Sequence, residues 1–482
     1  MNKPNLLFLY TDEQSIHTMA SYGNTQIEMP NLNRLSDQSS FFQQTYVTQP
    51  VCTPSRSALL SGLYPHNNGC IQNNIPLDKN IKCFPELLDD SEYKTGHFGK
   101  WHLGDELFRQ HGFDQWISTE DGYQGFFREG LDRNTRSDDC KHLIQQGFNP
   151  ENGKFFSRGE SAKLPEEFSK PAFLAEHSKR FIEENKNAPF ALFVNFLEPH
   201  MPFFSPRDNQ YDPEDIPLPE NFGHELSETN PSKTKFFAHR YHQHGISGID
   251  LSSERGWKQL RANYWGLCCL VDKYVGEIID KLKECSLYDD TMIVFTSDHG
   301  DMMGSHRLVA KCVMFEEAVR VPFFIKLPGQ IEGKRIKGPV SQIDIIPTLL
   351  DVLGKNIPEN LDGKSLRTLV ESGGTVDKSN DVFIEWLGTD GCGGPQTSIP
   401  ESLQERIPDK NALDKYLGDR VCALVSPSGW KYNWSPLGEN ELHDLNTDPG
   451  EVHNLAFEPD QKSRIADMRK KITKWKAEVK YA

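Results

Sequence analysis

Short apolar runs alternate with longer amphipathic segments along the N-terminal part of the chain. The runs are rich in Leu, Val, Ile and Phe, and they lie at residues 5–10, 190–197, 291–300 and 321–328. Such runs are typical of parallel strands that are buried on both faces. Between the second and third runs, residues 260–285 have the period and length of a long amphipathic helix. The pattern therefore predicts an α/β fold.

The composition becomes loop-like near residues 370–380. Beyond this point the patterns predict a strand, a hairpin that turns at a glycine, and a closing helix, at residues 381–388, 420–436 and 460–479. We therefore predict a large domain over residues 1–375 and a smaller C-terminal α+β subdomain over 376–482. The subdomain is expected to hold a small antiparallel sheet and the closing helix.

The size and the charge of the chain limit its class. With 482 residues, of which 37% are hydrophobic and 25% charged, it can bury a large core. The formal net charge of −16 argues against a general binder of nucleic acid or of anionic membranes, because both need a broad basic face. An anionic substrate must therefore be captured by a local cationic or metal site.

Ten cysteines are spread without a regular pattern, and Cys268 and Cys269 are neighbours in the helical segment. We therefore expect buried thiols in a reducing compartment rather than a disulfide framework. The first apolar run continues into an acidic motif without a small-residue cleavage site, which favours a core strand over a signal peptide. No segment has the length of a membrane span. We expect a cytoplasmic protein, or a periplasmic one if a leader has been removed.

Acidic and histidine residues follow two of the apolar runs, where the predicted strands end. Asp12 and Glu13 follow the first run, and Asp298 and His299 lie at the end of the third. Ligands bind at the carboxyl ends of strands in such sheets, and carboxylates and imidazoles hold divalent cations. These four residues are therefore candidate metal ligands. The alternative is that the acidic residues cap helices.

The stretch VCTPSRSALLSGLYPH, residues 51–66, predicts a helix with a Ser/Thr cap, a proline at its first position and a stop at Gly62. Cys52 is then placed at the positive end of a helix dipole, where an anion or a group that reacts with one is favoured.

Three further segments supply basic and histidine side chains. In HFGKWHLG, Lys100 and His102 are two positions apart and share one face if the chain is extended, and His200 lies between two prolines in a predicted non-helical turn. Each histidine alone is more typical of a packed or surface residue than of a catalyst. Lys311 and Arg320 alone are typical of a solvated helix face.

Together these clusters resemble the sulfatase family of the alkaline phosphatase superfamily. Residues 52–62 fit its pattern C-x-P-S-R-x-x-x-x-x-G, and the other segments follow in that family's order: GKWHLG, SDHG, VSQIDIIPTLLDVLG, LDGKSL and ELHDLNTDPGEVHNL. The resemblance covers nearly the whole chain. It implies an alkaline phosphatase-like fold, with a large mixed, mostly parallel sheet sandwiched by helices, and it makes residues 1–375 the catalytic domain.

The resemblance implies that Cys52 is oxidised to Cα-formylglycine by a formylglycine-generating enzyme that reads Pro54 and Arg56. The hydrated aldehyde has two hydroxyls, so that one can attack a sulfate ester and the other can expel sulfate. The resemblance also implies a divalent metal, Ca²⁺ by family habit with Mg²⁺ or Mn²⁺ as alternatives, held by Asp12, Glu13, Cys52, Asp298 and His299.

The remaining roles also come from the resemblance. Arg56 is expected to hydrogen-bond the diol and to brace the metal carboxylates. Lys100 and Lys311 are expected to pair with the sulfate oxygens. His102 is expected to take the proton from the second hydroxyl, and His200, with Lys311, to protonate the departing alcohol.

Two positions depart from the commonest form of the motif. Glu13 stands where many sulfatases have a second aspartate, and His299 stands where many have asparagine. The Asp-His pair is similar to the subgroup that includes iduronate sulfatase, choline sulfatase and the phosphonate monoester hydrolases. Because imidazole also suits manganese and zinc, the metal is less defined than with oxygen ligands alone, and we favour calcium.

Residues 105–170 and 205–256 are rich in aromatic, His, Arg and Gly residues, and we expect them to form loops around the pocket. Ordinary polar surface is the alternative. Aromatic and cationic side chains suit a sulfated mono- or oligosaccharide. Two other functions stay open: a phosphonate monoester or phosphodiester hydrolase with the same nucleophile, and a non-catalytic carbohydrate-binding relative with an unmodified Cys52.

Overall fold

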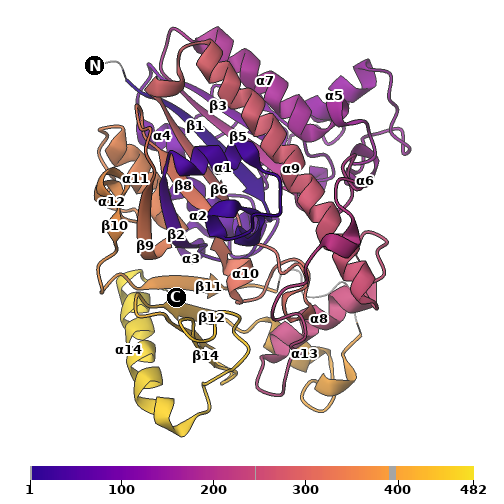
Figure 1. Ribbon diagram of the computed structural model, residues 1–482, viewed down its shortest axis with the longest axis vertical. Coiled ribbons are helices and arrows are strands. Elements are labelled where there is room, and N and C mark those ends of the chain that lie inside the picture. The colour runs from indigo at the N-terminus through magenta and orange to yellow at the C-terminus, as the bar shows by residue number, and fades with distance from the viewer. Residues whose placement is uncertain (1–2, 245, 390–397, 482) are drawn as a thin grey trace.

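The computed structural model describes residues 3–244, 246–389 and 398–481 (Figure 1). A large sheet has the strand order β10-β9-β2-β8-β6-β1-β5-β3-β4, and β7 pairs with β2. Its strands are β1 (Asn5–Asp12), β2 (Ser40–Tyr46), β3 (Lys94–Gly99), β4 (Gln115–Ile117), β5 (Phe190–Pro199), β6 (Thr291–Ser297), β7 (Arg320–Val321), β8 (Phe323–Lys326), β9 (Lys334–Ser341) and β10 (Gly374–Thr375).

The centre of this sheet is parallel, as the apolar runs predict. Strand β1 pairs in parallel with β5 and with β6, and every residue of β1 is buried. Thr11 is in register with Ser297, so the polar residues that follow β1 and β6 meet at one edge of the sheet. This register brings together the two acidic clusters that lie far apart in the sequence.

The apolar run at residues 321–328 is not a parallel strand. Pro322, which has no backbone N–H to donate, separates β7 from β8. Strand β8 pairs antiparallel with both β6 and β2, and β7 pairs antiparallel with β2. The prediction of a parallel strand here was wrong because an apolar run indicates that a strand is buried on both faces but does not indicate its direction.

Helices cover both faces of the sheet. Side chains alternate along β1, so that Leu7 and Leu9 join one core and Leu6 and Phe8 the other. The first core is covered by α1 (Pro30–Asp37), α7 (Lys170–Asn185) and α9 (Glu254–Glu284). The second is covered by α2 (Cys52–Ser61), α4 (Phe84–Leu88), α11 (Ile345–Val352) and α12 (Arg367–Ser372). The other α-helices are α3 (Pro65–Asn68), α5 (Asp138–Gln145), α6 (Arg158–Ser161), α8 (Ser232–His244), α10 (Glu316–Val319), α13 (Lys410–Leu417) and α14 (Lys462–Glu478).

The C-terminal elements follow the sequence pattern closely. A second, antiparallel sheet has the order β11-β12-β13-β14, and α14 packs on it, at the lower end of the view in Figure 1. Its strands are β11 (Val382–Trp386), β12 (Val421–Val425), β13 (Trp430–Trp434) and β14 (Glu441–Asp444). The predicted strand, hairpin and closing helix are confirmed. The division of the chain into domains at 375/376 stays a prediction.

Two other expectations concern the whole chain. Nine cysteines are free in the described part, and all but Cys285 are buried, whereas Cys392 lies outside the described residues. None of the helices that the structure describes combines the length and the apolar character that crossing a membrane requires.

The two segments that were expected to form loops around the pocket, residues 105–170 and 205–256, include β4, α5, α6 and α8. These segments are therefore partly regular rather than only loops, with Gly245 outside the described residues.

Candidate active site

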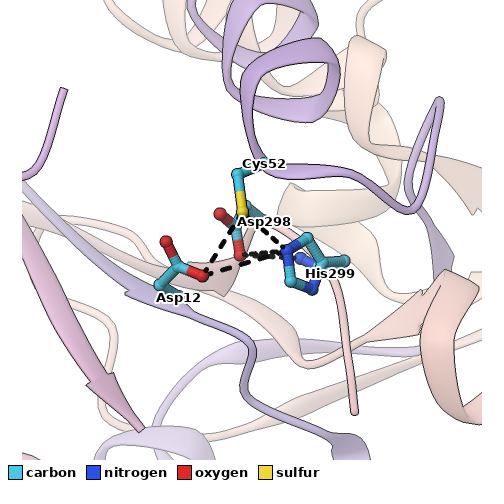
Figure 2. A group of neighbouring side chains, drawn as sticks. All are labelled: Asp12, Cys52, Asp298 and His299. Atoms are coloured by element: carbon cyan, nitrogen blue, oxygen red, sulfur yellow. Dashed lines mark hydrogen bonds and ion pairs between the residues drawn. The ribbon is translucent and has the colours of Figure 1, made fainter. Parts of the chain in front are cut away.

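The site forms where the ends of β1 and β6 meet the first turn of α2. Figure 2 shows Asp12, Cys52, Asp298 and His299 pointing toward one another, and one ligand atom of each lies within 4.8 Å of the others. Cys52 Sγ lies 3.2 Å from His299 Nε2 and 3.8 Å from Asp12 Oδ1. All four residues are buried. The sheet register therefore joins both strand-end clusters to the cysteine.

The start of α2 differs from the prediction. The helix begins at Cys52, its N-cap is Val51 without a side-chain hydrogen bond, and Pro54 is the third helical residue. The expected Ser/Thr cap is therefore wrong, whereas Gly62 ends the helix in the left-handed conformation with φ 70°, as predicted. Since Val51 offers no cap, the Thr53 N–H donates instead to Asn73 Oδ1 at 3.0 Å, and Cys52 lies at the N-terminal, positive end of α2.

Arg56 joins the two acidic clusters. Its Nε lies 2.9 Å from Asp298 Oδ2, and one terminal nitrogen lies 3.0 Å from Asp12 Oδ2. The other terminal nitrogen donates to the Lys100 carbonyl at 2.9 Å, and the guanidinium lies over the Tyr10 ring at 4.8 Å. With only 1% of its surface exposed, this side chain fixes both carboxylates by paired, charge-assisted hydrogen bonds.

Two lysines and a histidine lie against the carboxylates of Asp12 and Glu13. Lys100 Nζ lies 2.5 Å from Asp12 Oδ2, and Lys311 Nζ lies 3.1 Å from Glu13 Oε2. His200 Nε2 lies 3.4 Å from the same Glu13 oxygen. Lys311 is buried in a loop rather than on a solvated helix face. Arg320 lies apart from the site, in β7, where it donates to the Gln43 carbonyl.

The backbone carries Lys100 and His102 into the site by bending. Gly99 has φ 105° and His102 has φ 60°, so the segment is not extended and the expected shared face does not form. A Cβ on Gly99 would lie 1.9 Å from the Asn195 carbonyl oxygen, so only glycine fits there. The bend directs Lys100 to Asp12 and places the His102 carbonyl on the Thr53 hydroxyl, beside Cys52.

His299 is held so that one ring nitrogen faces the site. Its Nδ1 lies 3.0 Å from the Gly300 carbonyl oxygen, which can only accept, so Nδ1 carries the proton. The Nε2 lone pair is then directed at Cys52 and at the two aspartates, 3.6 Å from Asp298 and 3.8 Å from Asp12. This orientation by the second nitrogen is typical of a histidine that binds a metal.

The carboxylates differ in their pKa. Burial opposes ionisation of Asp12, but Lys100, foremost among the nearby cations, holds the pKa of Asp12 well below its usual range. At Glu13 burial prevails over Lys311 and raises the pKa of the carboxyl to about 8. Burial also raises the pKa of the Cys52 thiol to about 11, so the unmodified side chain is protonated at neutral pH.

The imidazoles are neutral in this environment. Burial, followed by the charge of Lys311, holds the pKa of His200 well below its usual range. Burial and then Lys100 do the same to the pKa of His102, and burial lowers the pKa of His299. A neutral imidazole can accept a proton or bind a cation through its free nitrogen.

The donor set fits a divalent cation. Asp12, Asp298 and His299 offer two carboxylates and one imidazole lone pair beside Cys52, and a second group joins Asp12 to Glu13 and His200. The Glu13 Oε1 atom is buried and has no hydrogen-bond partner among the described residues. Oxygen-rich sites with one imidazole suit calcium, magnesium or manganese. The other carboxylate oxygen of Glu13, Oε2, lies near Lys311 and His200, at 3.1 and 3.4 Å.

Sequence reasoning missed the residues that fix His102. Asn74 Oδ1 lies 3.1 Å from His102 Nε2, and because this oxygen can only accept, Nδ1 is the free acceptor. Glu106 accepts from the backbone N–H groups of Trp101 and His102, at 2.8 and 2.6 Å. An acidic residue four positions after His102 is a signal that could have been found, whereas nothing in the sequence points to Asn74. Tyr123 packs on the His102 ring at 4.7 Å.

The fold and the site together define a class: a hydrolase with an alkaline phosphatase-like sheet, in which a buried cysteine at a helix start lies among carboxylates and cations. The chain matches the family model named Sulfatase over residues 4–355 and belongs to that family. It is a sulfuric ester hydrolase.

Known relatives extend over most of the chain. The multifunctional alkaline phosphatase superfamily protein PehA of Trinickia caryophylli is 28% identical, with 99% of this chain and 96% of that protein covered. The N-acetylglucosamine-6-O-sulfatase of Bacteroides thetaiotaomicron is 26% identical, with 94% and 82% covered. Among solved structures, the phosphonate monoester hydrolase of Silicibacter pomeroyi has a TM-score of 0.77 at 23% identity, with 98% and 95% covered, which shows the shared fold.

Proposed function

We propose that the chain removes sulfate from a sulfated saccharide, with Cys52 in its formylglycine form as the nucleophile and a divalent cation, calcium by preference, beside it. One observation carries the proposal: Cys52 lies within 4.8 Å of the ligand atoms of two aspartates and one histidine, in a buried site that also holds Arg56, Lys100 and Lys311. These cations are the charges that an acidic protein needs where a sulfate anion binds.

The two implied groups supply defined chemistry. A cation held at this site would stabilise negative charge on the sulfate oxygens and on the attacking hydroxyl. The hydrated aldehyde at position 52 supplies one hydroxyl for attack and a second whose deprotonation expels sulfate. Asp12, Asp298 and His299 are the residues that would hold the cation, and Glu13 offers a further carboxylate in the group that it forms with Asp12 and His200.

The residues of the chain orient the charges and move the protons. Arg56 keeps the two aspartates in place, and Lys100 and Lys311, which lie beside Asp12 and Glu13, would pair with sulfate oxygens. His102 Nδ1 is free to accept the proton of the second hydroxyl. His200 is neutral without substrate, and a sulfate ester beside it would raise its pKa, which prepares it to protonate the departing alcohol.

The saccharide part of the proposal draws on relatives and on the surroundings of His102. One relative is named as an N-acetylglucosamine-6-O-sulfatase and another as an ulvan-active sulfatase. Tyr123 presents an aromatic ring beside His102, which suits a sugar ring. A panel of monosaccharides sulfated at single positions tests it: release of sulfate from at least one member is expected, and turnover of choline sulfate alone would contradict the saccharide assignment.

A second candidate function is the hydrolysis of phosphonate monoesters or phosphodiesters. It is favoured by the likeness to PehA, whose name describes it as multifunctional. The same nucleophile can attack phosphorus, and the same cations can pair with its oxygens. Comparing kcat/KM for 4-nitrophenyl sulfate with that for 4-nitrophenyl phenylphosphonate separates the two, because the proposed function requires the sulfate ester to be the better substrate.

Removal of the cation is expected to lower both turnover and stability. A ligand that binds only the folded state at about 100 times its Kd contributes about 2.7 kcal/mol to the free energy of unfolding. Treatment with EDTA should therefore lower the thermal unfolding midpoint, and added Ca²⁺ should restore it. The Asp298→Asn variant is the control, since its midpoint should respond little to either addition. An equal response in the variant would contradict this site.

Substitution His102→Ala is expected to slow sulfate release rather than the first bond cleavage. The loss of one general base costs about 10²- to 10⁴-fold in rate. Rapid-mixing measurements with 4-nitrophenyl sulfate should show a burst of nitrophenol followed by slow turnover. The control variant His453→Ala, at an exposed histidine, should show the same kinetics as the protein without substitutions. Normal steady-state kinetics in His102→Ala would refute the assigned role.

A further inference from the structure

A cationic pocket lies on the segment that covers His102. It has a volume of about 520 Å³, and its lining includes Gln124, Arg133, Arg136, Lys141, Lys154 and Phe155. No aspartate or glutamate is among the described residues that line it. A lining with four cations and no acidic residue is unexpected in a chain with a net charge of −16, so this pocket is a local exception to the acidic balance.

Of the four cations that line the pocket, only Lys141 is paired with a carboxylate among the described residues. Arg136 is held by hydrogen bonds to the backbone carbonyls of Lys154 and Gly153, at 2.5 and 3.0 Å, which leave its positive charge uncompensated. Lys141 forms an ion pair with Asp138 at 3.0 Å. Within the described residues, neither Arg133 nor Lys154 has a carboxylate within ion-pair distance. The pocket therefore keeps a positive potential that favours an anion.

Two chain segments link the pocket to the surroundings of His102. Tyr123, whose ring packs on His102 at 4.7 Å, directly precedes Gln124 of the pocket. Arg158 donates to the Tyr123 hydroxyl at 2.8 Å, and its own segment supplies Phe155 to the pocket. Buried Glu120 accepts a hydrogen bond from Arg158 Nε at 2.7 Å. This bond holds the segment of Arg158 against the segment of Glu120 and Tyr123. The same chain segments thus form the cover of His102 and the lining of the pocket.

We infer that this pocket is an outer subsite for a second anionic group, a sulfate or a carboxylate, on the saccharide chain whose sulfate ester reacts at Cys52. The inference rests on the proposed function, and it specifies a polyanionic rather than a singly sulfated substrate. Planar guanidinium groups bind sulfate and carboxylate oxygens in pairs, and a glutamine amide with a phenyl ring suits sugar hydroxyls and a sugar face. The volume lies in the range of small-molecule sites.

Direct binding of sucrose octasulfate, measured by calorimetry at low salt, tests the inference. The pocket variant is Arg133→Glu with Lys154→Glu. Its matched control is Lys462→Glu with Lys470→Glu, which changes the net charge equally at exposed positions of α14, far from α5 and α6 (Figure 1). Two charge reversals at a partly screened surface are expected to weaken binding by about tenfold or more. The difference should shrink as salt shortens the range of the charges.

The controls keep each outcome decisive. Arg133→Gln with Lys154→Gln removes charge without adding repulsion and should give an intermediate affinity, so the result does not depend on folding of the doubly reversed variant. Equal binding by the pocket and control variants, or no binding by the unmodified chain, would overturn the subsite. Because the readout is binding rather than turnover, loss of the subsite and failure of the proposed hydrolysis are observed separately.

Discussion

Substitution Cys52→Ala is expected to abolish sulfate ester hydrolysis, with turnover lower by about 10⁴-fold or more, because it removes the group that forms the covalent bond. The cations and the carboxylates around position 52 would remain, and they could still bind sulfate. The variant should therefore retain affinity for inorganic sulfate while it loses turnover of 4-nitrophenyl sulfate. Both quantities can be measured on one preparation, by calorimetry and by nitrophenol release.

The same substitution has a small cost in stability. Although Cys52 begins a helix, it is only 2% exposed, and its sulfur lies 3.2 Å from His299 Nε2. Removing one buried heavy atom costs on the order of 1 kcal/mol in the free energy of unfolding. Urea unfolding should show this modest change, which the fold can absorb, so the loss of turnover cannot be assigned to unfolding.

The matched control is Cys285→Ala, which removes a partly exposed thiol at the end of α9. It should leave turnover unchanged. Mass analysis of the peptide that spans residues 51–56 complements the variants, because it distinguishes an aldehyde from a thiol at position 52. A thiol in fully active protein from the native host, or retained turnover in Cys52→Ala, would contradict the nucleophile.

The meeting of the two strand-end clusters could be predicted from the sequence. Apolar runs predict β1, β5 and β6, and in parallel strands the carboxyl ends must meet at one edge of the sheet, so the proximity of Asp12 to Asp298 follows from pattern alone. The motif around Cys52 adds a helix start that points at this edge. These parts were predictable because each depends on local periodicity and on one topological rule.

Other parts depend on contacts that no local pattern encodes. The direction of β8 is set by its pairing with β2 and β6, and the bend that turns Lys100 toward Asp12 requires Gly99 against the Asn195 carbonyl. Asn74 reaches His102 from a loop that the spacing of residues does not mark. Such placements arise from tertiary packing, so a single sequence does not determine them.

Substitution Asp12→Asn is expected to cause the largest combined loss of stability and activity. Asp12 is fully buried and contacts both Lys100 and Arg56, at 2.5 and 3.0 Å. Asparagine keeps the shape but not the charge, so the Lys100 ammonium would stay buried without a carboxylate partner. Breaking a buried ion pair on one side costs about 3–5 kcal/mol, and the proposed cation site loses a ligand in the same step.

Urea unfolding measures the first loss, and turnover of 4-nitrophenyl sulfate measures the second. The control is Asp280→Asn, which breaks an exposed pair with Lys283 on α9 and should change the free energy of unfolding little. The double variant Asp12→Asn with Lys100→Met separates the two effects. It should recover much of the stability, because no unpaired ammonium remains, yet stay inactive, because the carboxylate is still absent. A double variant no more stable than Asp12→Asn would show that the Asp12–Lys100 pair is not the source of the loss.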